Sequence, residues 1–167
     1  EDVSVEVDIS GFVPPRVVQQ WFAPNGISYL GEPMEMWGVC IHQTGNTSPS
    51  AEAQANVNYM RSDACIQRQA SWHATVGLDT IIETIPDDRQ AYHGSDGDGP
   101  GNAHFYAIEG VMCYPPASPE FRRVMQNHAW YAAAKLHAKG LPLVPIVQDA
   151  DWSRGVTLAQ HNSFARD

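Results

Sequence analysis

One apolar run that ends in a histidine constrains the fold of this chain most. Residues 36–41 read Met-Trp-Gly-Val-Cys-Ile and are followed by His42 and the polar stretch Gln-Thr-Gly-Asn. A short apolar run bounded by turn residues is typical of a buried strand. Ligands and metals usually bind at the edge of an α/β sheet where its strands end. We therefore take His42 as the first candidate metal ligand.

The rest of the pattern predicts a single α/β domain with a mixed central sheet flanked by helices. Further strands are expected at residues 70–78, 81–85, 105–114 and 156–161, and helices at 50–62 and 118–140. The last of these helices has a serine cap, a proline in its first turn and a glycine at its end. Residues 1–30 are expected to form an N-terminal arm with a short helix at 16–22, and residues 31–167 the main domain.

The charge of the chain excludes some partners. The formal net charge is −9, so nucleic acid is not expected, because phosphate contacts require lysine and arginine. The chain has no polybasic segment and no apolar run long enough to span a bilayer, so a membrane partner is not expected. No signal peptide opens the chain, and it does not begin with methionine. We expect it to be part of a larger protein.

The residues that could carry chemistry are spread along the chain. His42 and His161 both end apolar runs, and Glu109 lies within the strand expected at 105–114. A catalytic zinc ion needs three protein ligands and one open position, and neutral imidazole is a common ligand. A nearby carboxylate could act as general base on the zinc-bound water. The cysteines contain no CxxC pair, which excludes a thiolate zinc knuckle. Cys40 and Cys113 are expected to be buried thiols, and a disulfide stays open.

Five segments in the same order resemble the type 2 N-acetylmuramoyl-L-alanine amidases, a group that includes phage endolysins and is related to peptidoglycan recognition proteins. They are Ile-His-Gln-Thr-Gly-Asn at 41–46, Ala-Ser-Trp-His-Ala-Thr-Val at 70–76, Gln-Ala-Tyr-His-Gly at 90–94 with Gly-Pro-Gly-Asn at 99–102, Tyr-Ala-Ile-Glu at 106–109, and Ala-Gln-His-Asn at 159–162. The resemblance covers most of the chain. One difference is Ala107, where the family usually has glycine.

The resemblance implies a Zn²⁺-dependent hydrolase that cleaves the amide between N-acetylmuramic acid and L-alanine in peptidoglycan. It implies that His42 and His161 bind zinc and that Glu109 is the general base. The residues implied to bind substrate are Trp72, His73, His93 and Asn102. It further implies a bacteriolytic domain, phage-encoded or secreted, that acts on the bacterial cell wall. We expect a monomer that is linked to other lysin domains.

Some alternatives stay open at this stage. The family's third zinc ligand, a Cys or Asp, follows the second histidine, so it lies beyond residue 167 or is Asp167. An incomplete zinc site would make the chain a non-catalytic peptidoglycan-binding module, and a zinc peptidase that cuts within the stem peptide is a third reading. His73 could satisfy a buried hydrogen bond instead of lying near the metal, and Trp72 could belong to the core. We interpret Asp96 and Asp98 as turn residues.

Overall fold

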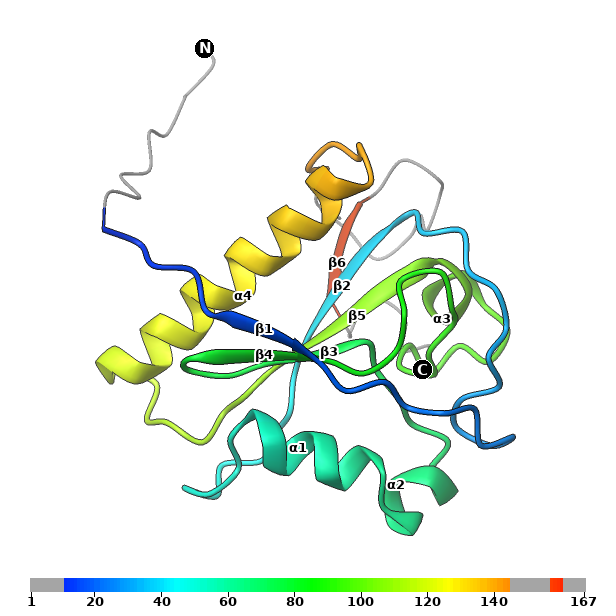
Figure 1. Cartoon of the computed structure of the whole chain (residues 1–167), viewed down its shortest axis with the longest axis horizontal. Helices are drawn as coiled ribbons and strands as arrows, with labels where there is room; N and C mark the ends of the chain where they lie inside the picture. The colour runs from blue at the N-terminus through cyan, green and yellow to red at the C-terminus, as the bar shows by residue number, and fades with distance from the viewer. Residues whose placement is uncertain (1–10, 145–156, 161–167) are drawn as a thin grey trace.

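The computed structural model describes residues 11–144 and 157–160 of the chain. Within them, strands of one mixed sheet lie in the order β1-β4-β3-β5-β2-β6 (Figure 1). Only β3 and β4 pair antiparallel, and every other neighbouring pair is parallel. The strands are β1 (Arg16–Gln19), β2 (Gly38–Gln43), β3 (Ala74–Val76), β4 (Thr80–Glu83), β5 (Phe105–Gly110) and β6 (Leu158–Gln160). The expected mixed sheet is confirmed.

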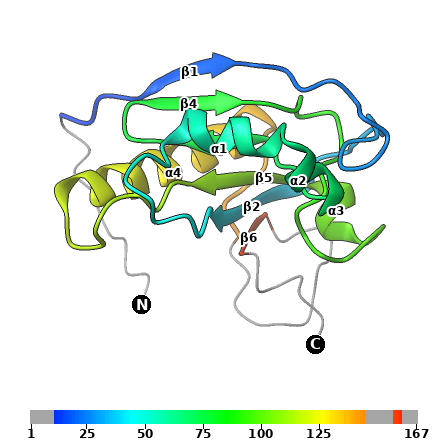
Figure 2. The same ribbon diagram turned by 90° about the horizontal axis from the view of Figure 1, so that it is seen from below.

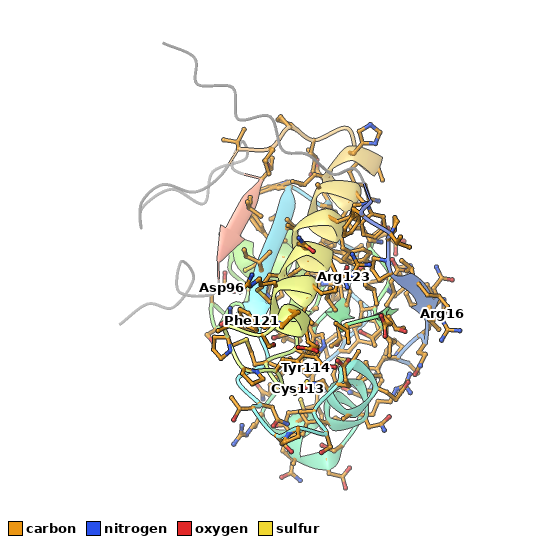
Figure 3. The ribbon with its side chains drawn as sticks, turned by 90° about the vertical axis from the view of Figure 1, so that its left-hand side faces the viewer. Arg16, Asp96, Cys113, Tyr114, Phe121 and Arg123 are labelled. Carbon is orange, nitrogen blue, oxygen red and sulfur yellow. The ribbon has the colours of Figure 1, made fainter. Side chains whose placement is uncertain are left out.

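Helices cover both faces of this sheet. They are α1 (Ala53–Met60), α2 (Asp63–Gln67), α3 (Pro100–His104) and α4 (Pro119–Ala138). Figure 2 shows α1 and α2 in front of the sheet and α4 behind it. In Figure 3, α4 crosses its face between β6 on one side and β1, which carries Arg16, on the other. Among the described helices, none is both long and apolar enough to cross a membrane.

The longest helix, α4, follows from local signals in its sequence. Ser118 accepts a hydrogen bond from the Phe121 amide at 3.1 Å, which caps the first turn. Gly140, just past the end, has a φ of +65°, a left-handed conformation that glycine adopts without strain. One apolar face of α4, which includes Tyr131 and Leu136, packs against the sheet. The helix expected at 118–140 is therefore confirmed.

Several predicted boundaries differ from the observed ones. The short helix expected at 16–22 is wrong, because residues 16–19 form strand β1, which pairs parallel with β4. A proline before this segment suggested a helix start, but proline also fits extended backbone, and Val17 and Val18 favour a strand. The helix expected at 50–62 ends at Met60, and Ser62 then caps the separate helix α2.

The alternation of side chains along β2 and β5 decides which of them reach the site. Val39, Tyr106 and Ile108 pack in the core on the α4 side. Because successive side chains of a strand point to opposite faces, His42 and Glu109 point to the other face. They are also direct partners in the parallel register of the two strands. The sheet thus places the two side chains next to each other near the carboxyl ends of both strands.

Candidate functional site

A cleft of about 770 Å³ opens where β2 and β5 end. Most of the side chains singled out in the sequence line it, namely His42, Trp72, His93, Asn102 and Glu109. His73 does not line it, and His161 and Asp167 lie outside the described residues. The cleft therefore brings together the predicted residues that the structure describes, with one exception.

Two histidines face each other in the wall of this cleft. The Nε2 atom of His42 lies 3.0 Å from Nδ1 of His93, and the two rings are perpendicular. The other ring nitrogen of His93, Nε2, lies 2.9 Å from the Phe105 carbonyl oxygen. That oxygen can only accept, so Nε2 of His93 is assigned a proton. Nδ1, the other ring nitrogen, faces His42.

The donor atoms at this point suit a zinc ion. Possible ligand atoms of Cys40, His42 and His93 all lie within 4.8 Å of one another. Two imidazole nitrogens on a tetrahedral zinc ion are separated by about 3.3 Å, close to the spacing of the histidine pair. Cys40 is completely buried, does not line the cleft, and its thiol pKa is raised by burial and by the negative charge of Glu109. Of these donors, the two histidines are the ones that face the cleft.

Glu109 has the environment of a proton-transfer group. Its Oε2 atom is buried and has no hydrogen-bond partner among the described residues. Burial raises the pKa of this carboxyl group from 4.5 to about 7, because desolvation disfavours the charged form. A carboxyl group whose pKa lies near neutral pH can both accept and return a proton. This is the chemistry that the sequence assigned to Glu109.

The glycine-rich loop is organised by two polar side chains. Oδ1 of Asn102 accepts hydrogen bonds from the His93 and Gly94 amides, both at 2.7 Å, and its Nδ2 donates to the Gly97 carbonyl at 2.9 Å. Asp96 accepts from the Gly101 amide at 2.7 Å. Asn102 was predicted to bind substrate, and these bonds within the loop use its oxygen and one of its two Nδ2 hydrogens. Its observed contribution is to hold the backbone of His93, and Asp96 has the expected turn role.

His73 lies in the core behind the cleft. It is completely buried, its Nδ1 accepts from the Ala107 amide at 2.9 Å, and its Nε2 donates to the Arg89 carbonyl at 2.8 Å. Burial, with a smaller contribution from His93, lowers its pKa to about 3, so the ring is neutral. This placement leaves no ring nitrogen for the predicted contact with substrate. The alternative reading, a buried hydrogen-bonded histidine, describes His73.

Trp72 belongs to the core and to the cleft at once. It packs with Met60, Cys65 and Ala107, and its Nε1 donates to the Thr75 hydroxyl at 2.7 Å. Its remaining exposed surface, 8% of the residue, lines the cleft. Part of the Trp72 side chain therefore belongs to the core, as one interpretation expected, and another part faces the cleft, where the other interpretation expected substrate.

Several residues of the cleft wall were not expected from the sequence. Among the described residues, only Gln69 and Ser95 combine a side chain with a positive φ, 56° in each case. Both line the cleft, as do Ile27, Leu30 and Arg68. Strained backbone of this kind often occurs at functional sites. No local sequence signal marks these residues, because the folding of separate loops brings them together.

The chain matches a protein-family model over most of its length. Residues 32–164 match the family model described as N-acetylmuramoyl-L-alanine amidase. This match extends over most of the chain, and the chain belongs to that family. The resemblance noted in its motifs is confirmed.

Two individual relatives match most of this chain. The chain is 26% identical over 138 residues to the N-acetylmuramoyl-L-alanine amidase XlyA of Bacillus subtilis. This aligned stretch covers 83% of this chain and 44% of XlyA. It is 35% identical over 138 residues to the bifunctional autolysin of Staphylococcus aureus, covering 82% of this chain and 9% of the autolysin. The chain thus spans less than half the length of these relatives.

The fold agrees with a solved structure. The catalytic domain of XlyA superposes with a TM-score of 0.72 at 22% identity, over 90% of this chain and 86% of that domain. The expected α/β fold with helices around a mixed sheet is confirmed, and it is the fold of the XlyA catalytic domain.

Proposed function

We propose that this chain is a zinc-dependent hydrolase of peptidoglycan that cleaves the amide between N-acetylmuramic acid and L-alanine. The family match and the names of its relatives support this reaction. The observation that carries it is Glu109, whose buried Oε2 has no described hydrogen-bond partner and whose strand partner is His42. Its place of action would be the bacterial cell wall, in a protein that is phage-encoded or secreted.

The metal would be held at the histidine side of the cleft. His42 and, outside the described residues, His161 are the proposed zinc ligands, and His93 is the described nitrogen donor nearest to His42. When bound there, zinc would polarise the amide carbonyl and lower the pKa of water toward about 7. The third ligand stays open.

The remaining steps are proton transfers and positioning by the chain itself. Glu109 accepts a proton from the attacking water at its carboxylate, while the water oxygen bonds to the lactyl carbonyl carbon. The C–N bond then breaks, and Glu109 returns the proton to the departing nitrogen of L-alanine. Trp72 walls one side of the cleft, and Asn102 fixes the backbone of His93. The products are a free carboxylic acid on the sugar and a free amine on the peptide.

The substitution Glu109→Gln tests the reaction, because it keeps the size of the side chain and removes the base. We expect it to lower the rate of turbidity loss of a cell-wall suspension by at least about 10²-fold, with zinc still bound. Glu32→Gln, at an exposed position outside the cleft, should leave the rate unchanged. Mass spectrometry of the native digest should show new amino-terminal L-alanine.

Two results would count against the proposal. Unchanged activity of Glu109→Gln would remove Glu109 as the base, and new ends within the stem peptide would indicate a peptidase. Wall binding without zinc and without new ends would instead support the alternative, a non-catalytic peptidoglycan-binding module.

A further inference from the structure

Part of the cleft wall is formed by residues that the proposed reaction does not use. We call it the Arg68 wall, and it consists of Ile27, Leu30, Arg68 and Gln69. Ile27 and Leu30 are apolar but 47% and 43% exposed. Both precede residue 32, where the match to the family model begins. This side of the cleft therefore includes residues that the shared family pattern does not describe.

The loop that presents Ile27 is held rigidly. Oδ1 of Asn25 accepts hydrogen bonds from the amides of Ile27 and Ser28 at 2.9 Å and of Tyr29 at 3.2 Å. A side chain that bonds the backbone in this way fixes a turn. An exposed aliphatic side chain on a fixed turn costs little conformational entropy when a ligand covers it.

The same loop is tied to the other walls of the cleft through Ser71. The Ser71 hydroxyl donates to the Ser28 carbonyl and accepts from the Tyr92 amide at 2.9 Å. The Ser71 amide donates to the Tyr92 carbonyl at 2.9 Å. These bonds join the loop at 25–29, the segment after α2 and the start of the glycine-rich loop. The Arg68 wall is therefore part of a preformed cleft.

Arg68 is the one lysine or arginine among the described residues that line the cleft. It is exposed at the end of α2, and no described carboxylate forms an ion pair with it. The chain as a whole carries a formal charge of −9, and Asp98 and Glu109 line the same cleft. A cation in this setting suits an anionic group on a ligand.

We propose that the Arg68 wall is a stem-peptide subsite that binds the γ-linked D-glutamyl residue following L-alanine. This inference rests on the proposed function, which makes peptidoglycan the ligand. Arg68 binds the free α-carboxylate of that residue, because guanidinium and carboxylate form paired, charge-assisted hydrogen bonds. Ile27 and Leu30 contact its two methylene groups. The α-carboxylate lies within about 7 Å of the nitrogen released by cleavage, two residue lengths at most.

The proposed subsite predicts a preference for ligands with a free α-carboxylate. Conversion of that group to an amide should remove the preference. In D-isoglutamine the same α-carboxyl group is an amide and carries no charge. The probes are two muramyl tripeptides, N-acetylmuramoyl-L-alanyl-γ-D-glutamyl-L-lysine and its D-isoglutaminyl counterpart, which differ in that group alone. Binding is measured by calorimetry on the Glu109→Gln protein, in which hydrolysis does not consume the ligand.

We expect the glutamyl peptide to bind about tenfold more tightly than the isoglutaminyl peptide. Adding Arg68→Gln should reduce this ratio to about one, whereas Arg68→Lys should keep part of it. Arg122→Gln removes the same charge from an exposed site outside the cleft and should keep the full ratio. Ile27→Ala should weaken both peptides alike.

The outcomes separate this inference from the proposed function. Equal affinities in the parent protein, no binding of either peptide, or an unchanged ratio in Arg68→Gln would overturn the subsite. Hydrolysis is followed separately on the native chain by mass spectrometry. A native chain that keeps the tenfold ratio but releases no L-alanine amino terminus would overturn the amidase reaction and support the subsite.

Discussion

At the scale of residues, the two halves of the site come from neighbouring strands. His42 and Glu109 are far apart in the sequence but are partners across β2 and β5. The proposed metal-binding half and the proposed proton-transfer half can therefore be removed one at a time. A variant that loses the base is expected to keep the metal, and a variant that loses a ligand is expected to keep the carboxyl group.

The substitution His42→Ala tests the metal-binding half. We expect zinc content to fall from about one ion per chain to below about 0.1, because a catalytic site offers only three protein ligands. Elemental analysis of the purified chain measures this directly. His104→Ala, which removes a ring that stacks on Trp37 outside the cleft, should keep the metal. Equal zinc in both variants would argue against His42 as a ligand.

The motif residues were predictable because neighbouring residues in the sequence mark the strands that carry them. His42 follows a short apolar run, and Glu109 interrupts another, so strand ends and candidate chemistry could be read together. The Arg68 wall could not be predicted in this way. Ile27 and Arg68 become neighbours in one cleft only after the hydrogen bonds of Ser71 join their loops.

At the scale of elements, one buried ion pair joins α4 to the sheet. Lys135 of α4 lies 2.7 Å from Oε1 of Glu83 at the end of β4, with 16% and 8% of the two side chains exposed. Tyr131 also donates to Glu83, and so does Gln19 of β1, at 2.5 and 3.1 Å. Burial by itself would raise the pKa of Glu83, but the bonds from Lys135 and Tyr131 hold it below its ordinary value.

Glu83→Gln should therefore be strongly destabilising. It leaves Lys135 largely buried without its closest counter-charge, which typically costs about 3–5 kcal/mol. Asp88→Asn is the control, since its side chain is 64% exposed and lies 3.8 Å from Arg89, apart from Lys135. A surface pair of that kind contributes about 0–1 kcal/mol. Denaturant unfolding measures the free energy of unfolding of both variants. Similar losses of stability would contradict the larger contribution expected of the buried ion pair.

Elements were predictable to different degrees. The caps of α4 lie within its own sequence, so both its ends could be placed from the sequence. Strand β1 has no such signal, since its partner β4 lies more than sixty residues away. Short edge strands of this kind are decided by tertiary pairing, which local propensity cannot supply.

At the scale of the whole molecule, buried neutral histidines make stability depend on pH. His128 of α4 is 6% exposed and donates from Nε2 to the Ile108 carbonyl at 3.1 Å. Burial lowers its pKa from 6.5 to about 4. Between these two pH values the unfolded chain binds a proton at this histidine and the folded chain does not. The free energy of unfolding must therefore fall as the pH falls from about 6.5 to about 4.

His128→Gln keeps a hydrogen-bond donor and removes this titration. We expect the native chain to lose about 3 kcal/mol more stability than the variant between pH 6.5 and pH 4, from one pKa shift of that size. Urea unfolding at several pH values measures the difference. His137→Gln, at an exposed position, should behave like the native chain. Parallel curves for all three proteins would exclude His128 as the source.

The parallel pairing of β2 with β5 also bears on the order of events during folding. Parallel neighbours cannot be joined by a tight turn, and here helices α1, α2 and α3 and the β3–β4 hairpin separate the two strands in the chain. Contacts between distant segments form slowly, because a long loop must close first. Helix α4 and the hairpin can form before His42 and Glu109 meet. The proposed hydrolytic activity would then recover later than helical structure, which makes it a stringent reporter of complete refolding.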